Sequence, residues 1–336
     1  MLSFPNGYRK RFMTSHRALL AIWLAVLGLS APAAWVRADT WQLEPGQDWK
    51  SVPSDAQDKY LRAVARTEKL VQTGEAKALA EEWQELKKDF PEIAEADLNT
   101  FIEAEVLFCK DNYAKASRTY DKFLDKDYID SPLYQAALER QFHIASSFFA
   151  GRKLKVLGII QLKGYATAIK IMDKITERAG DRSIGIQAAR VVAEHYEQKG
   201  RFSEAYLKWS EISWQRQTGP IAKDALLAMA RCKHAAYRGP KYNASHLSSA
   251  RSYYGEFQAR YPQDAKELQV DEILEKIDEQ IAYKQFTIGQ YYQRTGRVQA
   301  ANLYYDMVIR NWSDTKAAEM AQEMLGKSLP DKPRDK

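Results

Sequence analysis

The segment 281–317 is the feature that most constrains the fold of this chain. It reads as two amphipathic helices joined by a tight turn at residues 295–297. The small residues Gly289 and Ala301 stand where two such helices would come closest. No helix breaker lies upstream as far as Ala265, so the first helix is expected to begin near Glu267. A helix pair of about 34 residues cannot bury its apolar face alone, so further copies are expected elsewhere in the chain.

Upstream segments repeat the intervals of this unit. Trp83 follows Gly74 at the same interval as Tyr305 follows Gly296. Helix pairs are expected at about 60–93, 97–130, 132–178, 186–219 and 221–261, with 281–317 as the sixth. This period is typical of tetratricopeptide repeats, whose helix pairs stack into a solenoid. Because strand signals are lacking, the prediction is an all-α fold, an α-solenoid of about six tetratricopeptide-like helix pairs.

The third pair is interrupted by residues 151–164, GRKLKVLGIIQLKG, which are cationic and apolar. Two interpretations remain open for this insertion. It is either a helix extension or loop packed back on the solenoid, or a contact for a partner or a membrane. The second interpretation rests on the tendency of apolar patches flanked by charge to bind something.

The first 38 residues have the three parts of a secretory signal peptide. A basic start at 9–11 precedes an apolar run over 18–29, and 36–38 (VRA) is a plausible cleavage site. The run is shorter than the roughly 20 residues that a membrane span needs. An uncleaved anchor over 18–36 is the alternative, and both interpretations predict export.

The rest of the chain is expected to fall into four parts: an irregular leader at 39–57, repeats at 58–130, further repeats at 131–328, and a charged, disordered tail at 329–336. The first 38 residues carry 5 of the 50 Lys and Arg residues and no acid, which leaves 45 (50 − 5) against 44 Asp and Glu. This balance excludes the clustered basic charge that nucleic-acid binding requires.

The reactive residues form no pattern that indicates catalysis. Beyond His16, the histidines are scattered without metal-ligand spacing at His143, His195, His234 and His246. Cys109 and Cys232 are expected to be buried free thiols, because a repeat contacts mainly its neighbours. No cysteine precedes Cys109, so acylation of an N-terminal cysteine is not expected. We therefore expect no enzyme activity, no cofactor and no metal site.

Without a catalytic pattern, the expected functional element is a binding surface. In stacked helix pairs the first helices line a concave groove that binds extended peptides or another domain. Aromatic and Arg side chains commonly anchor such interfaces, although packing against the next repeat is the alternative for each aromatic residue. The candidate groove residues are Phe101, Glu105, Phe108, Phe148, Phe149, Arg190, Glu194, Tyr283, Phe286 and Arg294.

Two further expectations concern this groove. Tyr283, Phe286 and Arg294 belong to the last pair, which lacks a following repeat, so they are expected to help present a docking surface. Acidic and apolar residues, including Glu68 and Glu105, stand where repeat proteins that clamp chaperone C-terminal carboxylates carry Lys, Asn and Arg. That class of partner is therefore disfavoured.

Four segments of the C-terminal two thirds carry a family resemblance. They are LERQFHIASSFFAGRK at 138–153, AAYRGPKYN at 235–243, SSARSYYGEFQARYP at 248–262 and YYQRTGRVQAANLYYDMVIRNWSDT at 291–315. From about Ser131 onward the chain resembles the BamD (YfiO/ComL) family, the helical-repeat component of the machinery that assembles outer-membrane β-barrels.

The resemblance implies a non-catalytic periplasmic adaptor. Such a protein would dock on the POTRA domains of a BamA-like barrel and contact unfolded outer-membrane proteins. It would be exported, with cleavage near Ala38, and could associate peripherally with the inner face of the outer membrane. The alternatives are a periplasmic adaptor for cell division or peptidoglycan synthesis, similar to the CpoB/YbgF group, and an exported accessory subunit of an enzyme.

Overall fold

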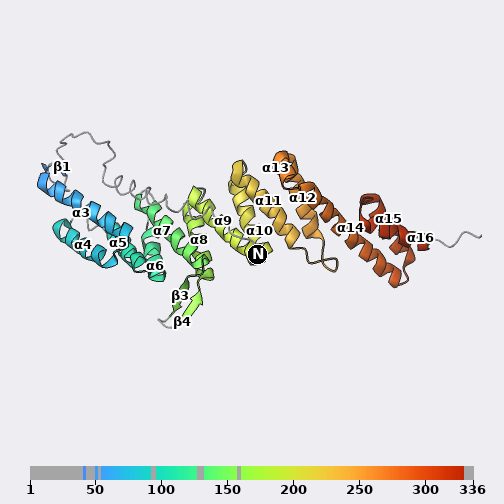
Figure 1. Ribbon diagram of the computed structural model, residues 1–336, viewed down its shortest axis with the longest axis horizontal. Coiled ribbons are helices and arrows are strands. Elements are labelled where there is room, and N and C mark those ends of the chain that lie inside the picture. Colours follow the sequence, from blue (N-terminus) through green and yellow to red (C-terminus); the bar gives the residue numbers. More distant parts are fainter. Residues whose placement is uncertain are drawn as a thin grey trace, which may run out of the picture. The chain divides into compact units, whose positions relative to one another are not determined.

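The computed structural model describes residues 41–42, 50–51, 54–91, 96–126, 132–156 and 160–328. These residues form 14 helices, α3 to α16, and two short antiparallel strand pairs (Figure 1). The all-α repeat fold expected from the sequence is confirmed. The expected signal peptide and charged tail lie outside the described residues.

Contacts along the chain divide it into two compact units, Met1–Ala179 and Gly180–Lys336. We call them the N-terminal unit and the C-terminal unit. The division falls after the third helix pair, whereas the sequence analysis placed a boundary between residues 130 and 131.

The N-terminal unit contains three helix pairs, whose members we call the first and second helix of each pair. They are α3 (Ser54–Thr73) with α4 (Ala76–Asp89), α5 (Ala96–Cys109) with α6 (Tyr113–Leu124), and α7 (Pro132–Phe149) with α8 (Tyr165–Ala179). In the leader that was expected to be irregular, β1 (Trp41–Gln42) pairs with β2 (Lys50–Ser51).

The insertion in the third pair is a β-hairpin, so the expectation of a helix extension or packed loop is wrong, as is the expectation that strands are lacking. β3 (Lys153–Val156) pairs antiparallel with β4 (Ile160–Lys163), with Lys153 opposite Lys163. Its residues KLKV and IQLK alternate polar and apolar, the period-two pattern of a strand. The hairpin extends beyond the adjoining ends of α7 and α8 (Figure 1).

The C-terminal unit continues with three more pairs, the short helix α13 before the last of them, and a final helix. Its elements are α9 (Ser183–Gln198), α10 (Phe202–Gln215), α11 (Gly219–Ala235), α12 (Ser245–Arg260), α13 (Pro262–Glu267), α14 (Val270–Arg294), α15 (Val298–Asn311) and α16 (Lys316–Ser328). The first helix of the last pair begins at Val270 rather than near Glu267, because Gln269 adopts a left-handed backbone with φ of 52°.

Four turns between paired helices share one geometry. Gly74, Asp111, Gly200 and Gly296 end the first helix with φ of 76°, 57°, 70° and 78°. The next residue then donates its N–H to the carbonyl five positions back, as Arg297 does to Tyr292 at 2.9 Å. This is the Schellman arrangement, which satisfies carbonyls at a helix end. The predicted turn at residues 295–297 is thereby confirmed.

In four of the six helix pairs, a buried ring on the second helix follows a buried small residue on the first helix at a fixed interval, and at Gly289 the Tyr305 ring lies against the backbone. The ring follows the small residue by 16 positions in four pairs: Thr67 and Trp83, Ala104 and Tyr120, Ala193 and Trp209, and Gly289 and Tyr305. All eight residues are buried. The polar atom of each ring finds a partner; Trp209 Nε1 donates to Glu197 at 2.6 Å and Tyr305 Oη donates to Gln293 at 2.7 Å.

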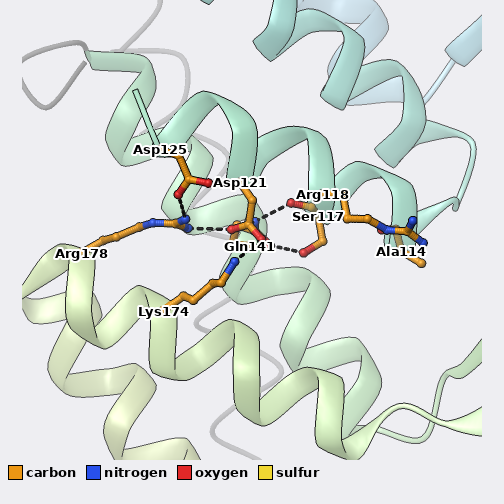
Figure 2. Close-up of polar contacts among 8 residues, drawn as sticks. All are labelled: Ala114, Ser117, Arg118, Asp121, Asp125, Gln141, Lys174 and Arg178. Atoms are coloured by element: carbon orange, nitrogen blue, oxygen red, sulfur yellow. Dashed lines mark hydrogen bonds and ion pairs between the residues drawn. The ribbon is translucent and has the colours of Figure 1, made fainter. Parts of the chain in front are cut away.

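A buried polar network joins the second and third pairs of the N-terminal unit (Figure 2). The Gln141 amide of α7 donates to the carbonyl of Ser117 at 2.8 Å and to Asp121 at 3.2 Å, and it accepts from Ser117 Oγ at 2.7 Å. Lys174 and Arg178 of α8 each donate to Asp121 at 2.7 Å. The Asp121 carboxylate of α6 therefore holds α7 and α8 together, and its charge is compensated by two cations.

The close approach of α14 and α15 at Gly289 can be tested by substitution. A methyl at Gly289 would lie 2.6 Å from Tyr305 Cε1, whereas a methyl at Gly255 in α12 would meet nothing within 4 Å. Overpacking of this kind costs about 1–3 kcal/mol, and the gain in helix propensity from Gly to Ala, about 1 kcal/mol, offsets only part of it. We expect Gly289→Ala to unfold at a lower urea concentration than wild type.

Gly255→Ala is the matched control, because it gains the same helix propensity without a clash. It should unfold at a slightly higher urea concentration than wild type. A Gly289→Ala protein as stable as Gly255→Ala would contradict the packing of Tyr305 on the backbone of α14.

Candidate functional site

A pocket opens between the first helices of the three N-terminal pairs. Its volume is about 240 Å³. The residues that line it come from α3 and its turn, from α5 and its turn, from the start of α6, and from α7. They are Glu68, Val71, Gln72, Thr73, Gly74, Phe101, Glu105, Phe108, Cys109, Asp111, Tyr113, Arg140 and His143.

The wall between α5 and α7 is built on a buried ion pair. Arg140 Nε and Nη2 donate to the two oxygens of Glu105 at 2.8 and 2.9 Å. Tyr120 Oη donates to the same carboxylate at 2.6 Å. Burial, and then the Glu105 charge, raise the pKa of Tyr120 well above its usual value, so the phenol keeps the proton that it donates. The two-point geometry fixes the orientation of the guanidinium.

Aromatic rings and cations form a stack beside this ion pair. The Arg140 guanidinium lies 4.5 Å from the centre of the Phe108 ring, and Phe108 stacks on Tyr113 at 5.1 Å. The Arg152 guanidinium lies 4.3 Å from the centre of Tyr113. His143 meets the Phe108 ring edge-on at 5.3 Å. Each contact of a cation with a ring adds to stability, and together they hold the rings in place.

Glu68 is the one pocket residue whose carboxylate has a buried oxygen without a hydrogen-bond partner among the described residues. Burial raises the pKa of Glu68 above its usual value. Arg66, a near neighbour on α3, pairs instead with Glu82 at 3.0 Å. A buried polar atom without a partner carries a free-energy cost.

The two cysteines are free, as expected. Burial raises the pKa of the Cys109 thiol to about 11 and that of the Cys232 thiol to about 12. Cys109 lines the pocket and its Sγ lies 4.0 Å from the carbonyl oxygen of Val71. Neither thiol is activated as a nucleophile, because activation requires a lowered pKa.

Three of the predicted groove residues, Phe101, Glu105 and Phe108, lie together in this pocket. Phe101 and Glu105 are only 2 % and 1 % exposed, so they form its floor rather than a protruding surface. Phe148 is 1 % exposed because the backbone of Gly164 closes over its ring. The expectation that Phe148 is a surface anchor is therefore wrong. Phe149 is half-buried.

The predicted residues of the C-terminal unit do not form one site. Arg190 donates to Glu194 at 2.8 Å on α9 and lies 3.4 Å from Asp224 of α11, so this pair connects two first helices. Tyr283 and Arg294 are exposed on α14.

Phe286 is buried because α16 packs against it, so the expectation that Phe286 presents a docking surface is wrong, whereas Tyr283 and Arg294 remain exposed. Ala317, Ala318 and Ala321 of α16 pack in one cluster with Phe286. Glu279 of α14 accepts hydrogen bonds from the N–H groups of Lys316 and Ala317, at 2.7 and 3.1 Å, which fixes the start of α16.

Glu68, Tyr113, Arg140 and His143 line the pocket but were not among the candidates. The sequence does contain a pattern that could have identified Glu68 as a pocket residue. Glu68 stands six positions before Gly74, as Glu105 stands before Asp111 and Glu194 before Gly200. For Arg140 no comparable interval marks its meeting with Glu105.

Comparison with protein-family models finds no match for this chain, and comparison with curated protein sequences finds none either. Among the described residues, no helix combines the length and apolar character that crossing a membrane requires. Within the same residues, no group of three or more His, Cys, Asp or Glu side chains could hold a metal ion.

Removal of Arg140 should be far more damaging than removal of a surface cation. Arg140→Met leaves Glu105 buried without its partner, which costs about 3–5 kcal/mol. Lys77→Met removes one member of an exposed pair with Glu81, for which the change should be below about 1 kcal/mol. Urea unfolding of both variants measures the difference.

The double variant Glu105→Leu/Arg140→Met separates charge from packing. It should be more stable than Arg140→Met, because no uncompensated charge remains in the core. A double variant less stable than Arg140→Met would show that the wall depends on the packing of these side chains and not on their pairing.

Thiol labelling tests the environment of Cys109. Its pKa of about 11, against a usual value of 9.0, lowers the thiolate population near pH 8 about a hundredfold. In a Cys232→Ala variant, iodoacetamide should therefore modify the native protein about a hundredfold more slowly than the same protein in urea. The rate should rise about tenfold per pH unit up to the pKa. Rapid labelling of the native protein at pH 8 would contradict this assignment.

Proposed function

We propose that this protein is a non-catalytic periplasmic repeat scaffold that takes part in the assembly of outer-membrane β-barrel proteins. It would bind a BamA-like partner through that partner's POTRA domains, unfolded barrel substrates, or both. The observation that carries the binding role is the pocket between α3, α5 and α7, on the face where helical repeats receive extended peptides. The resemblance of residues 131–328 to the BamD family supports the cellular role.

The wall of this pocket favours binding over chemistry. Its strongest polar groups, Glu105 and Arg140, are engaged with each other and with Tyr120. Cys109 is held as a neutral thiol. Because Glu105 and Arg140 are already oriented by their mutual pairing, this wall is preorganised to receive a ligand.

A second surface supports protein contacts by the C-terminal unit. On α10, Trp214 is 80 % exposed and Leu207 is 58 % exposed. They are seven positions apart, so they lie on one face of the helix. Exposed Trp side chains are frequent anchors of protein interfaces, and this face offers one for a partner domain.

Site-specific crosslinking in cells tests the proposal. A photoreactive amino acid replaces Gln72, which is exposed and lines the pocket, or Trp214 on α10. Envelope fractions are then analysed by mass spectrometry. We expect crosslinks to a POTRA-containing protein or to outer-membrane proteins from one or both positions.

The control position is Glu85, which is exposed on α4 outside the pocket. It should give neither product. Recovery of cell-division or peptidoglycan-synthesis proteins from Gln72 and Trp214, without a POTRA-containing protein, would contradict the proposal and favour the adaptor similar to the CpoB/YbgF group.

A further inference from the structure

The pocket of the N-terminal unit has an unbalanced negative charge. Glu105 is compensated by Arg140, and Asp111 pairs with Arg152 at 3.0 Å. Among the described residues Glu68 forms no such pair, and one of its oxygens is buried without a hydrogen-bond partner there. Among the carboxylates that line the pocket, Glu68 is therefore the one whose charge is not paired with a cation of the described residues.

The cost of burying the Glu68 carboxylate in the folded protein indicates a ligand. Burial raises its pKa, so the ionised form destabilises the folded protein. The contribution to stability is present at low pH, below the usual carboxyl pKa, and is lost as the pH rises through the raised value. A buried carboxylate oxygen without a partner carries a free-energy cost, which a ligand that donates to the carboxylate would remove.

The walls restrict the form of the ligand. The faces of Phe108 and Tyr113 are taken by each other and by Arg140 and Arg152, so they are not available to stack on a flat group. Beside Glu68 the pocket offers apolar surface from Val71 and Phe101. Its volume of about 240 Å³ lies below the roughly 300–1,000 Å³ of pockets that hold drug-sized ligands. It has room for one side chain.

We propose that this pocket binds the side chain of a Lys or Arg residue in an extended segment of a partner protein, with the Glu68 carboxylate accepting from its cationic head. The aliphatic stem of such a side chain packs on Val71 and Phe101 while its charged end meets the carboxylate. The inference rests on the proposed function only in taking a polypeptide as the ligand. It makes no use of the cellular pathway.

Fluorescence anisotropy with the purified chain tests this proposal. Short fluorescein-labelled peptides of Val, Ser and Thr, with blocked ends, carry Lys, Arg, norleucine or Glu at the centre. A charge-assisted hydrogen bond should make the Lys and Arg peptides bind about tenfold more tightly than the norleucine peptide, and the Glu peptide should bind least. Equal binding of the Lys and norleucine peptides by wild type would overturn the proposal.

Glu68→Gln removes the charge and keeps the shape. It should weaken binding of the Lys peptide about tenfold and abolish the preference over norleucine, while the midpoint of urea unfolding stays equal or rises. Glu85→Gln, on the exposed surface of α4, should leave both properties unchanged. Retention of the Lys preference in Glu68→Gln would assign the ligand to another group and refute the role of Glu68.

Two comparisons identify the occupant. A chain ending at Ser328 lacks the basic residues of the C-terminal segment. Equal affinity of this chain and the full chain for the Lys peptide supports a partner as the source of the side chain, whereas tighter binding by the shortened chain would assign the pocket to that segment.

A different result would refute the proposed cellular function without affecting this inference. Loss of crosslinks to barrel-assembly proteins together with an intact Lys preference would refute the pathway and keep this inference.

Discussion

The packing of a large ring near a small residue 16 positions earlier is the constraint that shapes four of the six helix pairs. A residue without a large side chain lets the two helices approach, and the ring fills the space between them. The aromatic NH or OH then needs a partner in the core, which Glu105 supplies for Tyr120, Glu197 for Trp209 and Gln293 for Tyr305. Polar residues on the first helices therefore take part in the helix packing. The residue types on the inner surface of a repeat depend in part on the hydrogen bonds that the buried rings require.

The N-terminal unit adds a layer of polar contacts between successive pairs. Glu105 bonds the ring of its own pair and also Arg140 of the next pair. Asp121 links α6 to α7 and α8 in the same way (Figure 2). Such buried groups demand complete pairing, because an unpaired one costs several kcal/mol. Glu68 in the pocket is not paired in this way, which is the basis for inferring a ligand there.

Spacing alone grouped three residues that the structure also places in one pocket. Phe101, Glu105 and Phe108 share a helix face, so the interval between them was sufficient to group them. Phe148 and Phe286 were also selected by their intervals along a first helix, yet both are covered. The backbone at Gly164 covers Phe148, and α16 covers Phe286. Both covering segments are attached by contacts between residues distant in the chain, such as Glu279 with Lys316. Periodicity within one helix contains no information on such contacts.

The sequence by itself determined the helix pairs and their turns, because these depend on interactions within about five residues and on a fixed interval between ring and small residue. It also marked Glu68, Glu105 and Glu194 as equivalent positions. Only the tertiary structure decided that Glu105, unlike Glu68, is compensated, since Arg140 reaches Glu105 from 35 positions away. It also decided that the insertion pairs with itself as a hairpin and that α16 closes the last pair. For Glu105 and for α16 the deciding energy comes from charge pairing or burial between separate elements, which local residue patterns do not encode.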